Sequence, residues 1–220
     1  MVVKSGRTDI TLHADGIALD GELVIPPSPI GVVAFAHASG NGRLTPRHRV
    51  IAEILHGERI GTLLFDLLTE QESEDPKKGL DVALLARRLL AAVDWLRSHP
   101  ETDGLAVGLF GAGTGASAAV IAAAERGGEI SALVSRGGRL DLIEGRLRDV
   151  RCPTLLVAGE VDRGAIRFTR RAYAELHCKK HLVLVPGATQ RFEEPGALEE
   201  AAHHATSWFG THLRPAAVMA

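Results

Sequence analysis

The sequence has 220 residues, of which 45% are hydrophobic and 24% charged, and its formal net charge is -2. This length suits one α/β domain over residues 1–220, and the near-neutral charge argues against nucleic acid as a partner. No apolar run approaches the roughly 20 residues that a membrane-spanning helix needs, and the first residues lack the pattern of a signal peptide. We therefore expect a cytoplasmic protein with no membrane or nucleic-acid partner.

The chain opens with two alternating segments, 8–13 and 17–25, around the turn Asp15-Gly16, which predicts a β-hairpin. A continuously apolar run at 31–36 is typical of a strand that is buried on both faces of a parallel sheet. We expect further strands at 62–67, 105–110, 132–135, 154–158 and 181–185, and helices at 46–56, 80–97, 115–126, 166–176 and 198–213. This order predicts an α/β fold: a mostly parallel, doubly wound sheet of about eight strands with an N-terminal antiparallel hairpin and no lid domain.

In such a sheet, ligands bind at the carboxyl ends of the strands, so the residues just after each strand are candidates for function. The most informative turn follows the run at 105–110, reads Gly111-Ala112-Gly113-Thr114-Gly115 and opens an Ala-rich helix. It has the small residues of a nucleophile elbow, G-x-S-x-G, whose strained turn lifts a serine hydroxyl above the sheet. Glycine stands at 113, where the motif has its serine.

From about residue 31 to the final helix the chain resembles the α/β-hydrolase superfamily, and within it the dienelactone hydrolase-like esterases and lactonases. The resemblance rests on six segments taken together: 37–40, 46–49, 110–115, 135–138, 159–162 and 186–194. It implies a catalytic Ser at 113, an acid at 162 and a His at 190, the order that this fold uses. The chain holds Gly113, Asp162 and Gln190 there, so only the acid is present.

A serine hydrolase needs an oxygen nucleophile, an imidazole base and a carboxylate that orients the imidazole. Gly113 offers no nucleophile and the amide of Gln190 has no useful basicity, so we expect little or no hydrolysis. The backbone amides of Ala38 and Thr114 need no particular side chain and are expected to form an oxyanion hole. The sequence predicts a site for an ester-, lactone- or carboxylate-like small molecule. The alternatives are an inactive hydrolase variant, or a protein that binds a ligand or performs lyase, isomerase or cyclase chemistry.

Three other polar residues lie near the expected site. Ser39, in the expected oxyanion loop, is the hydroxyl best placed to reach it, although without a base a structural role in the loop is the better interpretation. Ser117 lies one helical turn beyond Gly113 and is expected to pack on the sheet. His37 follows a strand and is expected to brace the oxyanion loop by hydrogen bonds, with a catalytic role as the alternative.

Arg136 ends a predicted strand, so its guanidinium faces the ligand crevice and is suited to binding a carboxylate or phosphate bidentately. The competing interpretation is a structural ion pair with Asp141 or Glu160. Asp66 also ends a strand, but an acid at that place is expected to tie down a neighbouring loop.

A remote alternative is that the same turn binds a dinucleotide, because Gly111, Gly113 and Ala116 follow an apolar strand and open a helix. That fingerprint normally occupies the first strand-helix turn of its fold, whereas several strands precede this one. The two cysteines, Cys152 and Cys178, have no metal-ligand spacing. We therefore expect neither a metal nor a cofactor.

Overall fold

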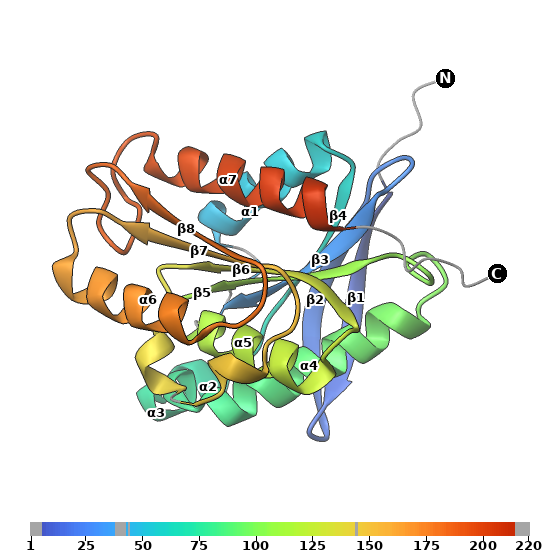
Figure 1. Ribbon diagram of the computed structural model, residues 1–220. Helices are drawn as coiled ribbons and strands as arrows, with labels where there is room; N and C mark the ends of the chain where they lie inside the picture. Colours follow the sequence, from blue (N-terminus) through green and yellow to red (C-terminus); the bar gives the residue numbers. More distant parts are fainter. Residues whose placement is uncertain (1–5, 38–42, 44, 144, 214–220) are drawn as a thin grey trace.

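A computed structural model describes residues 6–37, 43, 45–143 and 145–213 as a sheet with helices on both of its faces (Figure 1). The strands in this part of the chain are β1 (Gly6–Ala14), β2 (Ile17–Ile25), β3 (Gly31–His37), β4 (Ile60–Phe65), β5 (Val107–Ala112), β6 (Ile130–Arg136), β7 (Thr154–Gly159) and β8 (Lys180–Val185). The α-helices are α1 (Pro46–Gly57), α2 (Glu70–Ser73), α3 (Pro76–Leu80), α4 (Val82–Ser98), α5 (Thr114–Arg126), α6 (Arg163–Glu175) and α7 (Ala197–His212).

The eight strands form one sheet in the order β1-β2-β4-β3-β5-β6-β7-β8. The hairpin β1-β2 and its junction with β4 are antiparallel, and the other neighbouring pairs are parallel. This confirms the predicted doubly wound sheet with an N-terminal hairpin. The described residues between the strands form these helices, short 3₁₀ turns and loops, without a separate lid. Within the same residues, no helix combines the length and the apolar character needed to cross a membrane.

Two hydrophobic layers hold the helices to the sheet. Helices α1 and α7 cover one face, and α4, α5 and α6 cover the other (Figure 1). On the α1/α7 face the rings of Phe35 and Phe110 lie 4.8 Å apart between their centroids and are almost fully buried. Burial of such a side chain contributes roughly 1.5–3 kcal/mol, so the strands around the elbow are fixed by their packing.

The structure shifts some predicted boundaries by a few residues. Helix α4 begins at Val82 rather than at 80, because the Asp81 carboxylate accepts a hydrogen bond from the Leu84 N–H at 3.0 Å and caps the helix. Strand β5 runs to residue 112 rather than 110, which brings it to the edge of the elbow. The short helices α2 and α3 were not predicted; Thr69 and Glu72 form a capping box at the start of α2.

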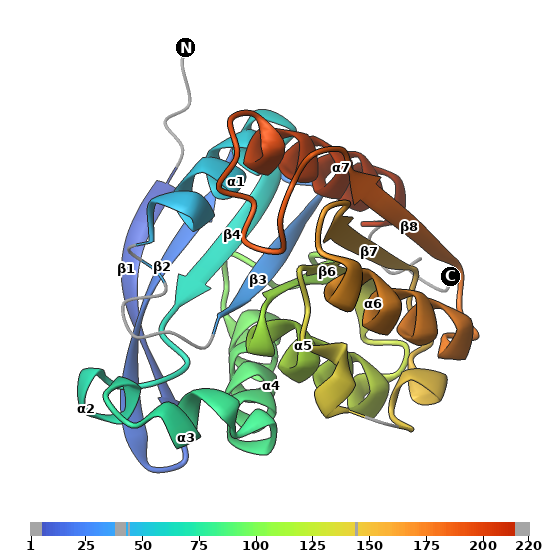
Figure 2. The ribbon, with the colours of Figure 1, turned by 90° about the vertical axis from the view of Figure 1, so that its left-hand side faces the viewer.

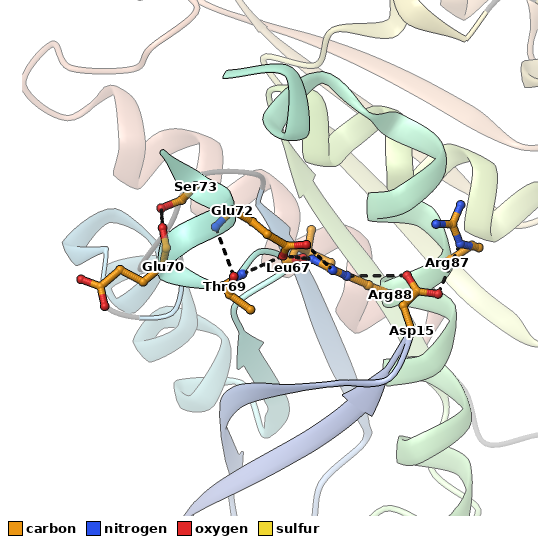
Figure 3. A network of polar contacts seen from close by, with 8 residues as sticks. All are labelled: Asp15, Leu67, Thr69, Glu70, Glu72, Ser73, Arg87 and Arg88. Atoms are coloured by element: carbon orange, nitrogen blue, oxygen red, sulfur yellow. Dashed lines mark hydrogen bonds and ion pairs between the residues drawn. The ribbon is translucent and has the colours of Figure 1, made fainter. Parts of the chain in front are cut away.

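The loop after β4 is fastened to the body of the protein by a buried arginine of α4 (Figure 3). The Arg88 side chain is 2% exposed, and its two Nη atoms donate to both Glu72 carboxylate oxygens at 2.6 and 2.8 Å and to the Leu67 carbonyl at 2.7 Å. Its Nε lies 3.7 Å from the carboxylate of Asp15 in the hairpin. The hydrogen bonds from Arg88 lower the pKa of Glu72 to about 2, so this pair is ionised at neutral pH.

Candidate functional site

The turn from β5 into α5 has the backbone geometry of a nucleophile elbow. Gly113 lies between them at φ 56° and ψ -127°, a left-handed conformation that strains any residue with a side chain. A Cβ at Gly111 would lie 2.8 Å from the Ala116 nitrogen, and one at Gly115 would overlap the backbone of Ala36. These two glycines therefore allow the strand and helix to approach each other closely. A Cβ at Gly113 meets no described heavy atom within 4 Å, so this position is open.

The sheet register places two polar side chains beside the elbow. His37 of β3 pairs with Ala112, which in turn pairs with Arg136 of β6, so the three residues are level at the carboxyl ends of their strands. Figure 2 views the molecule from the side on which β7 and β8 end. By strand alternation, His37 and Arg136 belong to the face covered by α1 and α7.

Hydrogen bonds between loops bring positions 113, 162 and 190 to this same edge of the sheet. The Arg139 N–H donates to the Gly113 carbonyl at 3.0 Å, which joins the loop after β6 to the elbow. The Gln190 side-chain amide donates to the Gly137 carbonyl at 2.9 Å, and the loop before Asp162 is bonded to the loop after β8. The three predicted positions thus lie on loops that contact one another.

The side chains at 162 and 190 are used by the scaffold. Asp162 caps α6, since its carboxylate accepts a hydrogen bond from the Ala165 N–H at 3.0 Å. Gln190 holds the loop after β6 through its bond to Gly137. A carboxylate that caps a helix and an amide that braces a loop supply no base for a nucleophile.

His37 is half-buried and uncharged at neutral pH. Its pKa is lowered to about 3, mainly by burial and in addition by electrostatic interaction with His48, Arg136 and Arg47. Its ring packs edge-on against that of His48, with the centroids 4.4 Å apart. A neutral imidazole can donate one hydrogen bond and accept another, so His37 is suited to orienting a group without carrying charge.

Arg136 is 7% exposed and stays protonated, although burial and then the charge of Arg47 lower its pKa to about 10. The expected pair with Asp141 or Glu160 is wrong. Asp141 binds Arg139 at 2.8 Å instead, and Glu160 is exposed. Among the described residues, none accepts a hydrogen bond from the Arg136 guanidinium or forms an ion pair with it. The loop after β6 turns the neighbouring Arg139, and not Arg136, toward Asp141.

The other predicted residues have plain roles or lie outside the described chain. Ala38 and Ser39 belong to residues 38–42, which the structure does not describe. Thr114 begins α5 and is half-buried, whereas Ser117 is fully buried and its hydroxyl donates to the Arg139 carbonyl at 2.6 Å. Asp66 ties down a neighbouring segment, as predicted, by accepting hydrogen bonds from the backbone and side chain of Arg43 at 3.0 Å.

Phe192 is the neighbour of the site that sequence reasoning missed. It is a buried residue with a φ of 54°, and its ring lies under Arg136, with the guanidinium carbon 5.2 Å from the ring centroid. Only tertiary structure reveals this contact, because the two residues are far apart in the sequence. In the part of the chain that the structure describes, no group of three or more His, Cys, Asp or Glu side chains is placed to hold a metal ion.

The parallel sheet, the antiparallel hairpin and the left-handed turn between β5 and α5 define an α/β-hydrolase fold. No family model matches the sequence. A crystal structure of dienelactone hydrolase from Anabaena variabilis is 44% identical, with a TM-score of 0.91, and the match covers 96% of this chain and 99% of that one. The chain therefore belongs to the dienelactone hydrolase family.

More distant solved structures share the fold. Est1E from Butyrivibrio proteoclasticus, also solved with ferulic acid bound, is 16% identical, with a TM-score of 0.77 over 91% of this chain and 97% of that one. A dienelactone hydrolase-like promiscuous phosphotriesterase, P91, from metagenomic libraries is 19% identical, with a TM-score of 0.76 over 94% of this chain and 98% of that one.

Curated relatives from two strains of Mycobacterium tuberculosis carry the name "Putative phosphoribosyl transferase". Each is 45% identical to this chain over 205 residues, which is 93% of the chain and 46% of the relative. The chain thus spans about half the length of the curated relatives it matches.

Proposed function

We propose that this protein is a dienelactone hydrolase family member that binds an ester-, lactone- or carboxylate-like small molecule in the cytoplasm without hydrolysing it. The observation that carries the proposal is the open elbow: Gly113 has the left-handed conformation of the nucleophile position but no side chain. Acyl transfer requires an attacking oxygen and a base to remove its proton, and neither Gly113 nor Gln190 supplies one.

The scaffold that would recognise a carbonyl group does not depend on the missing side chains. The N–H groups at the start of α5 have no intrahelical acceptor, and Gly113 provides no side-chain cap. Such N–H groups can stabilise an oxygen that carries negative charge. The binding function of the elbow is therefore separable from its hydrolytic function, which leaves lyase, isomerase or cyclase chemistry on a bound ligand as the alternative.

The name of the curated relatives suggests a phosphorylated sugar as one candidate ligand. The chain spans about half of those proteins, so the transferase activity in their name is not carried over to it. Arg136 favours an anionic ligand, and a sugar phosphate is one such ligand.

The dinucleotide alternative has less support. Gly111 and Gly115 are explained by the close packing of the turn against Ala116 and Ala36, without a pyrophosphate. Four strands also precede β5, so the turn is not the first strand-helix turn of the fold.

Reaction with a fluorophosphonate tests the proposal, because this reagent labels activated serines. We expect the intact mass of the protein to stay unchanged and p-nitrophenyl acetate to give no burst. Rapid labelling of one site per chain would show that another hydroxyl has taken the role of the nucleophile, and would overturn the proposal.

A further inference from the structure

Arg136 is a buried cation whose counter-charge is not supplied by the described protein. A guanidinium removed from water is strongly destabilising unless an anion pairs with it. Its Nε atom is inaccessible and lacks a hydrogen-bond acceptor among the described residues, which also provide no ion pair for the group. Residues 38–42 follow His37 in the chain and contain no Asp or Glu.

The protein holds Arg136 in place by contacts that leave its hydrogen bonds unused. The ring of Phe192 lies against the guanidinium, and a cation–π contact attracts the charge without accepting its N–H groups. Phe192 adopts a left-handed backbone conformation, which is unfavourable for a bulky residue and tends to occur at ligand sites. A strained residue that supports an unpaired charge is typical of a site organised before its ligand arrives.

The position of Arg136 connects it to the elbow. The residue is level with Ala112 across the sheet, one residue before Gly113, where a Cβ would meet no heavy atom of the described residues within 4 Å. The uncapped N-terminus of the 13-residue helix α5 opens at the same point, so a second source of partial positive charge faces that space.

We propose that Arg136 binds an oxyanion, a carboxylate or a phosphate monoester, carried by the small molecule that occupies the open elbow. Two parallel N–H donors of the guanidinium match two oxygens of either group. This inference rests on the proposed function for the position of the ligand and adds the class of group that the ligand must carry.

Arg47 strengthens the choice of an anion. It is close enough to lower the pKa of Arg136, and it is itself bound to Glu193 at 2.6 Å and to the Arg191 carbonyl at 3.0 Å. The Glu193 carboxylate is therefore already engaged. Beside it, His37 is neutral and adds no negative charge. Among the described residues no carboxylate balances the charge of Arg136, and an incoming anion would do so.

Titration with inorganic phosphate and with acetate tests the site, with sodium chloride at the same ionic strength and uncharged acetamide as controls. The readouts are the ¹⁵N–¹H NMR signal of the Arg136 Nε–H group and the thermal unfolding temperature. We expect a saturable shift of this signal with one or both anions and no shift with acetamide. A response to phosphate alone assigns a phosphate monoester, and a response to acetate alone assigns a carboxylate.

Arg136→Met is expected to weaken anion binding at least tenfold, whereas Arg139→Met, which removes the exposed neighbour bound to Asp141, leaves it unchanged. The proposed anion site would be refuted if neither anion shifted the Nε–H signal, or if both variants bound the anion with equal affinity. If Arg136→Met does not fold, the titration of the unchanged protein alone decides whether Arg136 binds an anion. Serine labelling by fluorophosphonate would refute the proposed function yet leave anion binding intact, so the two failures are distinguishable.

Discussion

Two buried arginines, Arg88 in helix α4 and Arg136 at the end of β6, differ in how the protein neutralises them. Arg88 meets the Glu72 carboxylate, the Leu67 carbonyl and, at longer range, Asp15 (Figure 3). Arg136 meets an aromatic ring and no carboxylate in the described chain. The first completes its ion pair within the fold and serves stability. The second keeps an unbalanced charge beside the elbow, which is the condition expected of a binding residue.

The largest expected effect is at the neutralised arginine. Arg88→Met should lower the free energy of unfolding by about 3 kcal/mol, because it breaks a buried ion pair and frees the loop after β4. Urea denaturation measures this loss. The matched control is Arg87→Met. Arg87 precedes Arg88 in α4, is largely exposed and lies 3.4 Å from Asp15, so this substitution should change the free energy of unfolding by less than about 1 kcal/mol. Equal losses in both variants would show that the Arg88 network adds little.

A change of the opposite sign in the free energy of unfolding is expected at Arg136, the arginine without a carboxylate partner in the described chain. In the absence of ligand, Arg136→Met should raise the free energy of unfolding by about 1 kcal/mol, because an apolar side chain replaces an unpaired buried charge. The same denaturation experiment measures it. A loss as large as that of Arg88→Met would mean that Arg136 is a structural residue whose partner lies within the protein.

The two regions should also respond to acid in different ranges of pH. The pKa of His37 falls from 6.5 to about 3 on folding, so below pH 6.5 the unfolded chain binds the proton first and stability decreases. From pH 6.5 to 5.5 the loss should be about 1 kcal/mol. Glu72, with a pKa lowered from 4.5 to about 2, adds its loss only below pH 4.5.

Urea titrations at pH 6.5 and 5.5 check this order. His37→Asn should remove most of the loss between these two values, whereas His203→Asn, an exposed position on α7, should leave it unchanged. A pH dependence that survives in His37→Asn would place its origin in another group.

The smallest expected effect concerns the dinucleotide alternative. Reduced nicotinamide nucleotide should produce no saturable change in the fluorescence of Trp95 and Trp208, since packing explains the glycines of the elbow. Saturable micromolar binding would favour that alternative instead.

The sheet, its hairpin and the elbow could be predicted because each depends on local patterns. Apolar runs mark the buried strands, and Gly111 and Gly115 mark the close turn. Helix α2 was missed although Thr69 and Glu72 have the spacing of a capping box, because four residues give too little periodicity for a helix prediction. A search for capped turns after each strand would have found it.

The lack of an ion-pair partner for Arg136 among the described residues could not be predicted from local patterns. The position of Arg136 at a strand end follows from the sequence, but Asp141 is near both Arg136 and Arg139 in the chain. Only the path of the loop after β6 decides which arginine takes the carboxylate. The ring of Phe192 likewise reaches Arg136 through a long-range contact and an unfavourable backbone conformation.

Restoring the missing groups tests the central claim most directly. In Gly113→Ser with Gln190→His, the serine Cβ meets no heavy atom of the described residues within 4 Å, and Asp162 already lies on the adjoining loop. We predict burst hydrolysis of p-nitrophenyl acetate by this double variant, absent from the original protein and from Gly113→Ser alone, and lost when Asp162→Asn is added. Circular dichroism confirms folding. A folded double variant without activity would contradict the view that this elbow is a hydrolase site that lacks only its nucleophile and base.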